Sequence, residues 1–150
     1  MSRPLAVVVL LLGLGSVLTG QAHKIPPLPE DAPRPVRLRS GVTIVDLEVG
    51  KGVRARRGRV VRILYTGWVD KTEFMFDHRG ERNNPLAFRI GAPGIIRGLS
   101  EGVVGMRVGG LRRIRIPARL AHGSKGTARI PPDSDLTYDV ELVGVSRPGA

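Results

Sequence analysis

The stretch "LTYDVELVGV", residues 136–145, decides the class of the fold because its apolar and polar side chains alternate. Successive side chains of a strand point to opposite faces, so Leu136, Tyr138, Val140 and Leu142 fall on one side. Strict alternation is typical of a strand that covers a core on one face only. The sequence therefore predicts a strand here, at the end of a one-sided sheet.

Three further stretches upstream have strand patterns. The segment "VTIVDLEVG" (42–50) alternates and ends in glycine, "GRVVRILYTG" (58–67) is rich in β-branched residues, and "LAFRIG" (86–91) is a shorter candidate. The chain lacks the regular helices that parallel strands need between them. These strands are therefore predicted to form an antiparallel sheet.

A fifth strand is predicted in "LRRIRIPA" (111–118), where charged and apolar side chains alternate. Arg113 and Arg115 fall on one face, and Ile114 and Ile116 fall on the other. This pattern predicts that the arginines face water and that the isoleucines are buried.

One helix is predicted within "PGIIRGLSEGVVGM" (93–106). Ile96, Leu99 and Val103 recur at spacings of three and four residues, which places them on one helical face. Gly98 and Gly102, which lie between these apolar residues, each weaken a helix by about 1 kcal/mol relative to alanine. A helix this short survives only when its apolar face is buried. We therefore expect an α+β fold, with a curved antiparallel sheet and one short helix packed on its concave face.

Residues 1–22 are predicted to be a secretory signal peptide. The segment begins with Arg3, continues with an uncharged apolar run of about 15 residues, and ends with small residues at Gly20 and Ala22. A bilayer-spanning helix needs about 20 apolar residues, so the run is short for one. The predicted protein is exported, periplasmic or secreted, with cleavage after Ala22. The alternative is a protein anchored in the membrane by an uncleaved signal.

The rest of the chain divides into three parts. Residues 23–40 contain five prolines and mixed charge, which predicts an extended linker that cannot pack a core. Residues 41–146 carry all the strand and helix patterns and form the predicted domain. Residues 147–150 are a short C-terminal tail.

The chain is strongly basic, with a formal net charge of +11. Removal of residues 1–22 takes away only Arg3 and leaves +10. Such a charge favours anionic partners, among which an anionic membrane surface is possible. The alternative is a soluble basic surface with no dedicated ligand.

Several kinds of chemistry are disfavoured by the residues present. The chain has no cysteine, so disulfides, thiolate catalysis and cysteine-ligated metals are excluded. The string "GSKGT" (123–127) is too short for a phosphate loop, and "IPP" follows where a helix would have to start. His122 lies near Ser124 without the elbow motif of serine hydrolases, and the three histidines lack metal-ligand spacing. Only 4% of residues are aromatic, so no nucleic-acid partner is expected.

An apolar concave site remains as the best candidate, because ligand clefts are commonly walled by aromatic and aliphatic side chains. Its expected lining comes from separated segments of the domain. The candidate residues are Tyr65, Phe76, Leu86, Ile95, Ile96, Leu99, Ile130 and Tyr138. The alternative is that these residues simply form the core.

Taken in order, several motifs resemble the FKBP-type peptidyl-prolyl cis-trans isomerases. They are "VVRILYTG" (60–67), "FD" (76–77), "RNNPLAFRIG" (82–91), "IIRGLSEGVVGMRVGG" (95–110) and "RIPPDSDLTYDVELVGV" (129–145). The resemblance extends over the whole predicted domain with nearly equal spacings. It implies a twisted antiparallel half-barrel wrapped around one short helix, which agrees with the fold expected from periodicity.

The resemblance also implies roles for individual residues. Phe76 would pack on the substrate proline, Tyr65 and Tyr138 would form the pocket walls, and Asp77 would be tied to Tyr65 and to Arg82. Ile95 and Ile96 would lie where the backbone pairs with a bound peptide, and Ile130 would close the pocket. The implied catalytic set is Tyr65, Phe76, Asp77, Ile96 and Tyr138. The implied substrate-binding set is Arg82, Leu86, Ile95, Leu99, His122 and Ile130.

Three positions depart from the family pattern. The tryptophan of the pocket floor is Leu99, an aromatic of the wall is Leu86, and the tyrosine of the glycine-rich lip is His122. We therefore expect an isomerase that needs no metal or cofactor, acts on unfolded or proline-containing polypeptides, and binds macrolides weakly. The alternative is a peptide- or partner-binding module of the same fold with weak or no isomerase activity. In either case His122 is interpreted as a substitute hydrogen-bond donor rather than a base.

Overall fold

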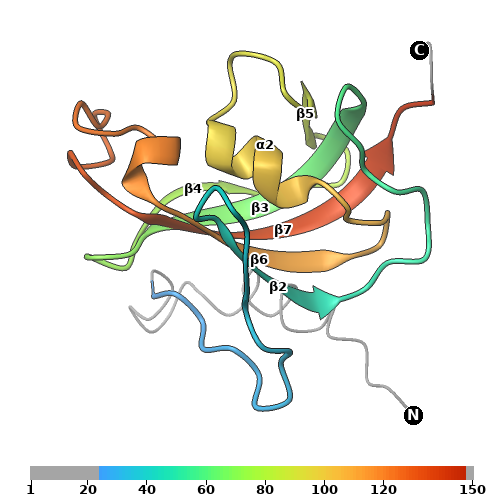
Figure 1. Ribbon diagram of the computed structural model, residues 1–150, viewed down its shortest axis with the longest axis horizontal. Helices are drawn as coiled ribbons and strands as arrows, with labels where there is room; N and C mark the ends of the chain where they lie inside the picture. The colour runs from blue at the N-terminus through green and yellow to red at the C-terminus, as the bar shows by residue number, and fades with distance from the viewer. Residues whose placement is uncertain (1–23, 148–150) are drawn as a thin grey trace.

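Within residues 24–147, seven strands form one twisted antiparallel sheet that curves around the one α-helix of this part of the chain (Figure 1). The computed structural model describes residues 24–147. The elements follow one another along the chain as β1 (Val36–Arg37), β2 (Thr43–Glu48), β3 (Val60–Val69), β4 (Phe74–Arg79), β5 (Leu86–Arg89), α2 (Arg97–Val103), β6 (Leu111–Ile116), the 3₁₀ turn η1 (Ala118–Leu120) and β7 (Leu136–Val145). The strand order is β1-β2-β6-β7-β3-β4, and β5 also pairs with β3. The expected fold class is confirmed.

Strand β7 lies in the middle of the sheet and matches the predicted stretch from end to end. Leu136, Tyr138, Val140 and Leu142 are all buried in the core, as their alternation predicts. Each strand pairing in the sheet is antiparallel. The core therefore lies between the concave face of this sheet and α2.

Strand β4 is an element that sequence patterns did not predict. Its sequence, "FMFDHR", has three large apolar residues followed by three polar ones and therefore shows no alternation. Phe74 is exposed, and the strand lies at the sheet edge. It pairs with the second half of β3, with a bulge between Gly67 and Trp68. This strand carries Phe76 and Asp77 to the sheet edge.

The two glycines of α2 lie where the helix meets the sheet. A Cβ atom at Gly98 would come within 2.2 Å of Ile116 Cγ2, and one at Gly102 within 2.4 Å of Ile114 Cγ2. Leu99 and Val103 are buried on either side of this contact. The glycines therefore permit the close packing of α2 on β6, which compensates for their low helix propensity.

The convex face of the sheet is not simply solvated, which corrects the expectation for Arg113. Arg115 is exposed and pairs with Asp70, but Arg113 donates to both carboxylate oxygens of Asp139 at 2.7 and 2.9 Å. A third bond of 2.7 Å joins Arg113 to the carbonyl oxygen of Pro26. The N-terminal segment thus passes beneath the face opposite α2 (Figure 1).

The segment expected to be a linker is partly structured. Its residues 36–37 form β1, which pairs with β2, and Leu38 packs against the core. The predicted signal peptide, residues 1–22, lies outside the described residues. Within residues 24–147, no helix is long and apolar enough to cross a membrane.

Candidate functional site

Three aromatic side chains meet on the concave face, each from a different strand. Tyr65 of β3 and Tyr138 of β7 have ring centroids 5.7 Å apart, and Phe76 of β4 lies edge-on to Tyr138 at 5.6 Å. Edge-to-face and tilted contacts are the favourable arrangements of aromatic pairs. The three strands therefore bring together aromatic residues that are up to 73 positions apart in sequence. We call Tyr65, Phe76 and Tyr138 the aromatic cluster.

Gly67 makes room for this cluster. A Cβ atom there would lie 2.6 Å from Phe76 Cζ, closer than side chains pack. A glycine inside a strand often marks a close approach of this kind. Gly67 had no predicted role. A glycine inside a strand rich in β-branched residues is the sequence signal that could have indicated this close contact.

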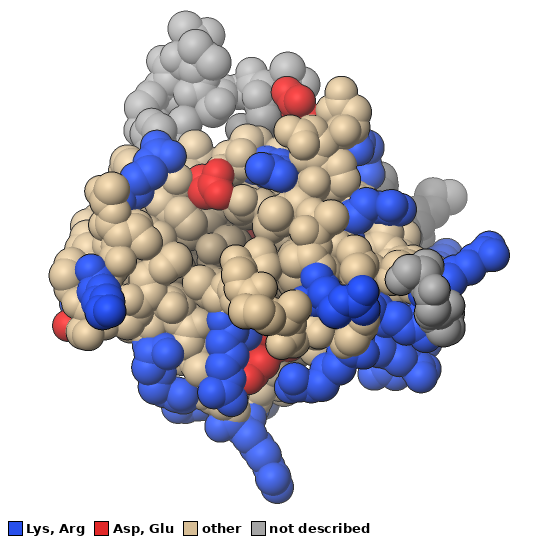
Figure 2. All heavy atoms as spheres, turned by 90° about the horizontal axis from the view of Figure 1, so that it is seen from above, with Lys and Arg blue, Asp and Glu red and all other residues tan. Residues whose placement is uncertain are grey.

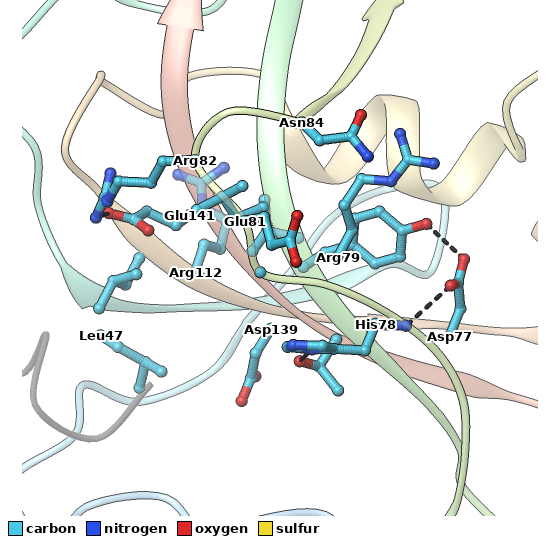
Figure 3. Close-up of a pocket in the computed structure, with 16 residues that line it drawn as sticks. Leu47, Asp77, His78, Arg79, Glu81, Arg82, Asn84, Arg112, Asp139 and Glu141 are labelled. Carbon is cyan, nitrogen blue, oxygen red and sulfur yellow. Dashed lines mark hydrogen bonds and ion pairs between the residues drawn. The ribbon is translucent and has the colours of Figure 1, made fainter. Parts of the chain in front are cut away.

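The hydroxyl of Tyr65 donates a hydrogen bond of 2.5 Å to Asp77 Oδ2. The other carboxylate oxygen of Asp77 accepts from the backbone N–H of His78 at 2.9 Å (Figure 3). Burial raises the pKa of Tyr65 above its ordinary value, and the hydrogen bond to Asp77 raises that pKa further. Burial likewise raises the pKa of Tyr138. Both phenols therefore stay neutral at physiological pH, and Tyr65 acts as a donor.

Arg82 is not part of this arrangement, so the expected tie between Asp77 and Arg82 is wrong. The Arg82 guanidinium pairs with Glu141 at 2.7 Å, on the opposite face of β7 from Tyr138. The loop after β4 carries Arg82 toward the convex face. Asp77 instead accepts hydrogen bonds from the Tyr65 hydroxyl and from the backbone N–H of His78, and neither bond requires an arginine.

Apolar side chains surround the aromatic cluster. Leu99 from α2 and Ile130 from the loop before β7 are buried in the same cluster of core residues. Leu86, Ile95 and Ile96 are half-buried and pack against it. All eight predicted apolar site residues therefore belong to one hydrophobic core or pack against it, although they are far apart in sequence.

The backbone at the start of α2 supplies a further polar group of the candidate site. Ile96 is the N-cap, and its carbonyl accepts from Leu99 and Ser100. Among residues 24–147, the N–H of Ile96 makes no hydrogen bond. An amide of this kind can pair with the carbonyl oxygen of a bound peptide.

His122 lies in the compact loop that follows η1. Its carbonyl oxygen accepts from Gly126 N–H at 3.2 Å, and the N–H of Asp133 closes the loop onto Gly123. Gly126 has a φ of +60°, and a Cβ there would lie 2.3 Å from the Ile130 carbonyl oxygen. The His122 ring forms no hydrogen bond with another residue of the described chain. Its role as a donor therefore stays a prediction.

A cavity adjoins one side of the aromatic cluster. It measures about 630 Å³, and Tyr65 and Asp77 are among the residues that line it. Part of the remaining lining, including Asp139 and Glu141, comes from the face of β7 opposite Tyr138. Figure 3 shows it between β4, β7 and the loop that carries Glu81 and Arg82. Its surface is more apolar than polar, and Asp139 and Glu141 are already paired with arginines, whereas the aromatic cluster is compact and almost closed. Cavity volume alone therefore does not locate the candidate site.

Comparisons with known proteins give a consistent result. The profile of the family described as FKBP-type peptidyl-prolyl cis-trans isomerase matches residues 51–143. The chain is similar to peptidyl-prolyl cis-trans isomerase FPR2 of Saccharomyces cerevisiae, with 42% identity over 62% of this chain and 70% of the relative. It is also 39% identical to the 46 kDa FK506-binding nuclear protein of Spodoptera frugiperda, over 73% of this chain and 26% of the relative. The chain thus spans about a quarter of the length of several curated relatives that it matches.

Two solved structures share the fold. FkpA from Escherichia coli aligns with a TM-score of 0.67 and 34% identity over 75% of this chain and 51% of that chain. AtFKBP13 aligns with a TM-score of 0.67 and 33% identity over 75% of this chain and 99% of that chain.

Proposed function

Because the chain belongs to the FKBP-type peptidyl-prolyl cis-trans isomerase family, we propose that it accelerates rotation about X–Pro peptide bonds. The aromatic cluster with its bound Asp77 is the observation that carries this proposal. It offers a proline ring three aromatic surfaces on the concave face of the sheet.

The chemistry needs surroundings rather than a reactive group. Resonance holds an X–Pro amide planar against a barrier of about 18–20 kcal/mol. Twisting the bond removes the resonance and reduces its charge separation. An apolar, water-poor surface shaped for the twisted amide therefore favours it over the planar one. A gain of about 1.4 kcal/mol for the twisted form gives a tenfold faster reaction.

Each group of the candidate site has a part in this proposal. Phe76 and Tyr138 contact the proline ring, and Tyr65 is held in place by Asp77. The N–H of Ile96 receives the carbonyl oxygen of the bound peptide. His122, at the lip, donates a weaker hydrogen bond when the ring nitrogen that faces the substrate carries the proton.

The substrates that we propose are unfolded or proline-containing polypeptides, and specifically exported proteins. The signal-like residues 1–22 support a periplasmic or secreted location, with an uncleaved membrane anchor as the second choice. We propose weak macrolide binding, because leucine at position 99 offers a bulky ring less contact area than tryptophan would.

A second candidate function is peptide binding without useful catalysis. Burial of the cluster favours it: Phe76 is 7% exposed, Tyr138 5% and Leu99 3%. A substrate proline would therefore contact the rim unless the lip moves. Leu86 and Leu99 also offer less aromatic surface than the family pattern has.

A proline-tetrapeptide isomerisation assay tests the proposed activity. We expect acceleration above the spontaneous rate at micromolar protein, a loss of about tenfold or more in kcat/KM for Phe76→Ala, and a smaller loss for Asp77→Ala. Phe74→Ala is the matched control, because Phe74 lies on the same strand but is 42% exposed and outside the cluster. No acceleration by the wild-type chain would exclude the isomerase, and Phe76-dependent peptide binding in that case would establish the binding module.

A further inference from the structure

The most basic surface of the described chain is the turn between β2 and β3. Residues 49–59 contain five cations, Lys51, Arg54, Arg56, Arg57 and Arg59, and no acidic residue. We call this segment the basic turn. Lys51, Arg54, Arg56 and Arg57 are exposed. The space-filling view shows Lys and Arg side chains gathered toward the lower and right-hand edge of the molecule, with few acidic ones among them (Figure 2).

The cations of the basic turn form no ion pair within residues 24–147, although Arg54 lines a hollow together with Asp46 and Glu48. All five ion pairs of the described chain involve other arginines. In addition, Arg54 faces Arg107 across an isolated antiparallel bridge. Like charges placed opposite one another on paired backbones repel. An anionic partner would relieve that repulsion.

Two exposed apolar side chains lie among these cations. Val49 is 72% exposed and Val53 is 59% exposed. They are the two most exposed large apolar residues of the described chain, and Val36 follows at 56%. Single exposed valines are ordinary on protein surfaces. Two of them within five residues, interleaved with cations, are the combination that a peripheral protein presents to a lipid surface.

The backbone holds this arrangement in place. Gly52 N–H donates to the carbonyl of Val108, Val108 N–H donates to the carbonyl of Val53, and Ala55 N–H donates to the carbonyl of Met106, at 2.7 to 3.0 Å. Hence the basic turn is paired with residues 105–110 rather than free. A surface that is already ordered loses less conformational entropy on binding.

The basic turn and the candidate site lie at opposite ends of the sheet. Strand β3 begins beside the basic turn at Val60 and reaches the aromatic cluster only in its second half, at Tyr65 (Figure 1). The glycine-rich lip and the β3–β4 turn lie at the far end with the cluster. Docking through the basic turn would leave the aromatic cluster directed away from the docked surface.

We propose that the basic turn is a docking surface for an anionic phospholipid membrane, on which Val49 and Val53 enter the headgroup region. The cations attract the negative surface, and the two valines add apolar contact that a purely electrostatic site would lack. This inference concerns a surface separate from the aromatic cluster and does not depend on isomerase activity.

Charge reversal at two ends of the molecule tests the location. The variant Lys51→Glu/Arg56→Glu/Arg57→Glu changes three exposed cations of the basic turn that form no ion pair with the described residues. The matched control, Lys71→Glu/Lys125→Glu/Arg129→Glu, makes the same change in net charge among exposed residues at the far end. Both full-length variants are compared with wild type by sedimentation with vesicles of equal parts phosphatidylcholine and phosphatidylglycerol.

We expect the first variant to lose about tenfold or more in partition coefficient, because each cation near an anionic surface contributes about fivefold. The control should lose much less, and salt should weaken the wild-type binding. Equal losses in both variants would mean that net charge, not the basic turn, governs binding, and would overturn the proposal.

A site-specific label separates lipid contact from simple attraction. The chain has no cysteine, so Val53→Cys and Lys125→Cys each give one position for a nitrobenzoxadiazole fluorophore. With the same vesicles, we expect a blue shift and brighter emission at position 53 and little change at position 125. The apolar N-terminal segment is identical in both proteins, so it cannot produce this difference. No change at position 53, or displacement from the vesicles by an oligonucleotide that binds the basic turn more tightly, would overturn the membrane assignment.

Discussion

At the scale of single residues, the only two tyrosines of the chain are both in the candidate site. Tyr65 and Tyr138 are buried, and both have a raised pKa for that reason first. Asp77 raises the pKa of Tyr65 further by accepting its hydrogen bond. Any optical signal from tyrosine ionisation therefore comes entirely from the aromatic cluster.

This predicts a loss of stability in alkaline solution. The folded protein keeps its phenolic protons at a pH where unfolded tyrosines, with a pKa of about 10, release theirs. The folded state then binds more protons, so the free energy of unfolding falls as pH rises above about 10. Urea unfolding across this range should show the loss, and ultraviolet titration should show tyrosine ionisation delayed until the protein unfolds.

The double variant Tyr65→Phe/Tyr138→Phe is the control for that experiment. It keeps every lysine and removes both phenols, so its stability should fall less steeply over the same pH range. An equally steep fall would assign the alkaline loss to other groups. Normal tyrosine ionisation in the folded wild-type protein would contradict the burial of the two rings.

At the scale of elements, the position of α2 depends on the close approach of its glycines to β6. Alanine is the better helix former by about 1 kcal/mol. In this helix, however, the added methyl at position 98 would overlap Ile116 Cγ2. Overpacking of a core costs about 1–3 kcal/mol, so the steric penalty exceeds the gain in propensity.

We therefore expect Gly98→Ala to lower the free energy of unfolding by about 1–2 kcal/mol net. Denaturant titration measures the change. Arg97→Ala, one residue earlier on the same helix, is exposed and loses only the surface ion pair with Glu101, so it should change stability by about 0.5 kcal/mol or less. A stabilised Gly98→Ala protein would show that α2 does not pack so closely.

At the scale of the whole molecule, Arg113 joins three parts of the chain that are far apart in sequence. It connects β6 to Asp139 on β7 and to Pro26 in the N-terminal segment. The side chains of Arg113 and Asp139 are only 12% and 11% exposed. In contrast, Arg115 is 62% exposed in its pair with Asp70, and Asp70 keeps a second bond from Thr137.

Removing these two arginines should have unequal effects. Arg113→Ala leaves a nearly buried carboxylate without its partner, which should cost about 2–4 kcal/mol of unfolding free energy. Arg115→Ala should cost less than about 1 kcal/mol. Arg113→Ala should also make the segment around Arg37 and Arg39 more sensitive to trypsin. Equal costs, together with unchanged cleavage, would mean that the N-terminal segment is not held by Arg113.

The sequence predicted the strands and the helix where hydrophobic periodicity is strict. It did not predict features that depend on tertiary packing or on the path of a loop. Apolar and polar residues alternate strictly from Leu136 to Leu142, and the strand was predicted with both ends correct. Strand β4 was missed because its buried Phe76 stands beside other large apolar residues in an edge strand with no alternation.

The candidate site could be predicted only in part. The apolar residues could be selected from the sequence as candidates for a pocket. Because they lie on five segments, only the family resemblance predicted that they come together. The tie between Asp77 and Arg82 was wrong because it depends on the path of the loop after β4, which carries no periodic signal. The glycines at positions 98 and 102 predicted a weak helix, whereas the structure shows that they are the points where α2 contacts β6. This contact could not be predicted without knowing which strand packs against the helix.

The central place of β7 has a consequence for the order in which the chain can fold during synthesis. Strand β7 is made last, yet it pairs with both β6 and β3 in the middle of the sheet. Strand β2 likewise has to wait for β6, more than 60 residues later. A nascent chain therefore cannot complete its sheet until Val145 has emerged from the ribosome, and β3 and β6 each keep one unpaired edge open to chaperones or other binding partners until then.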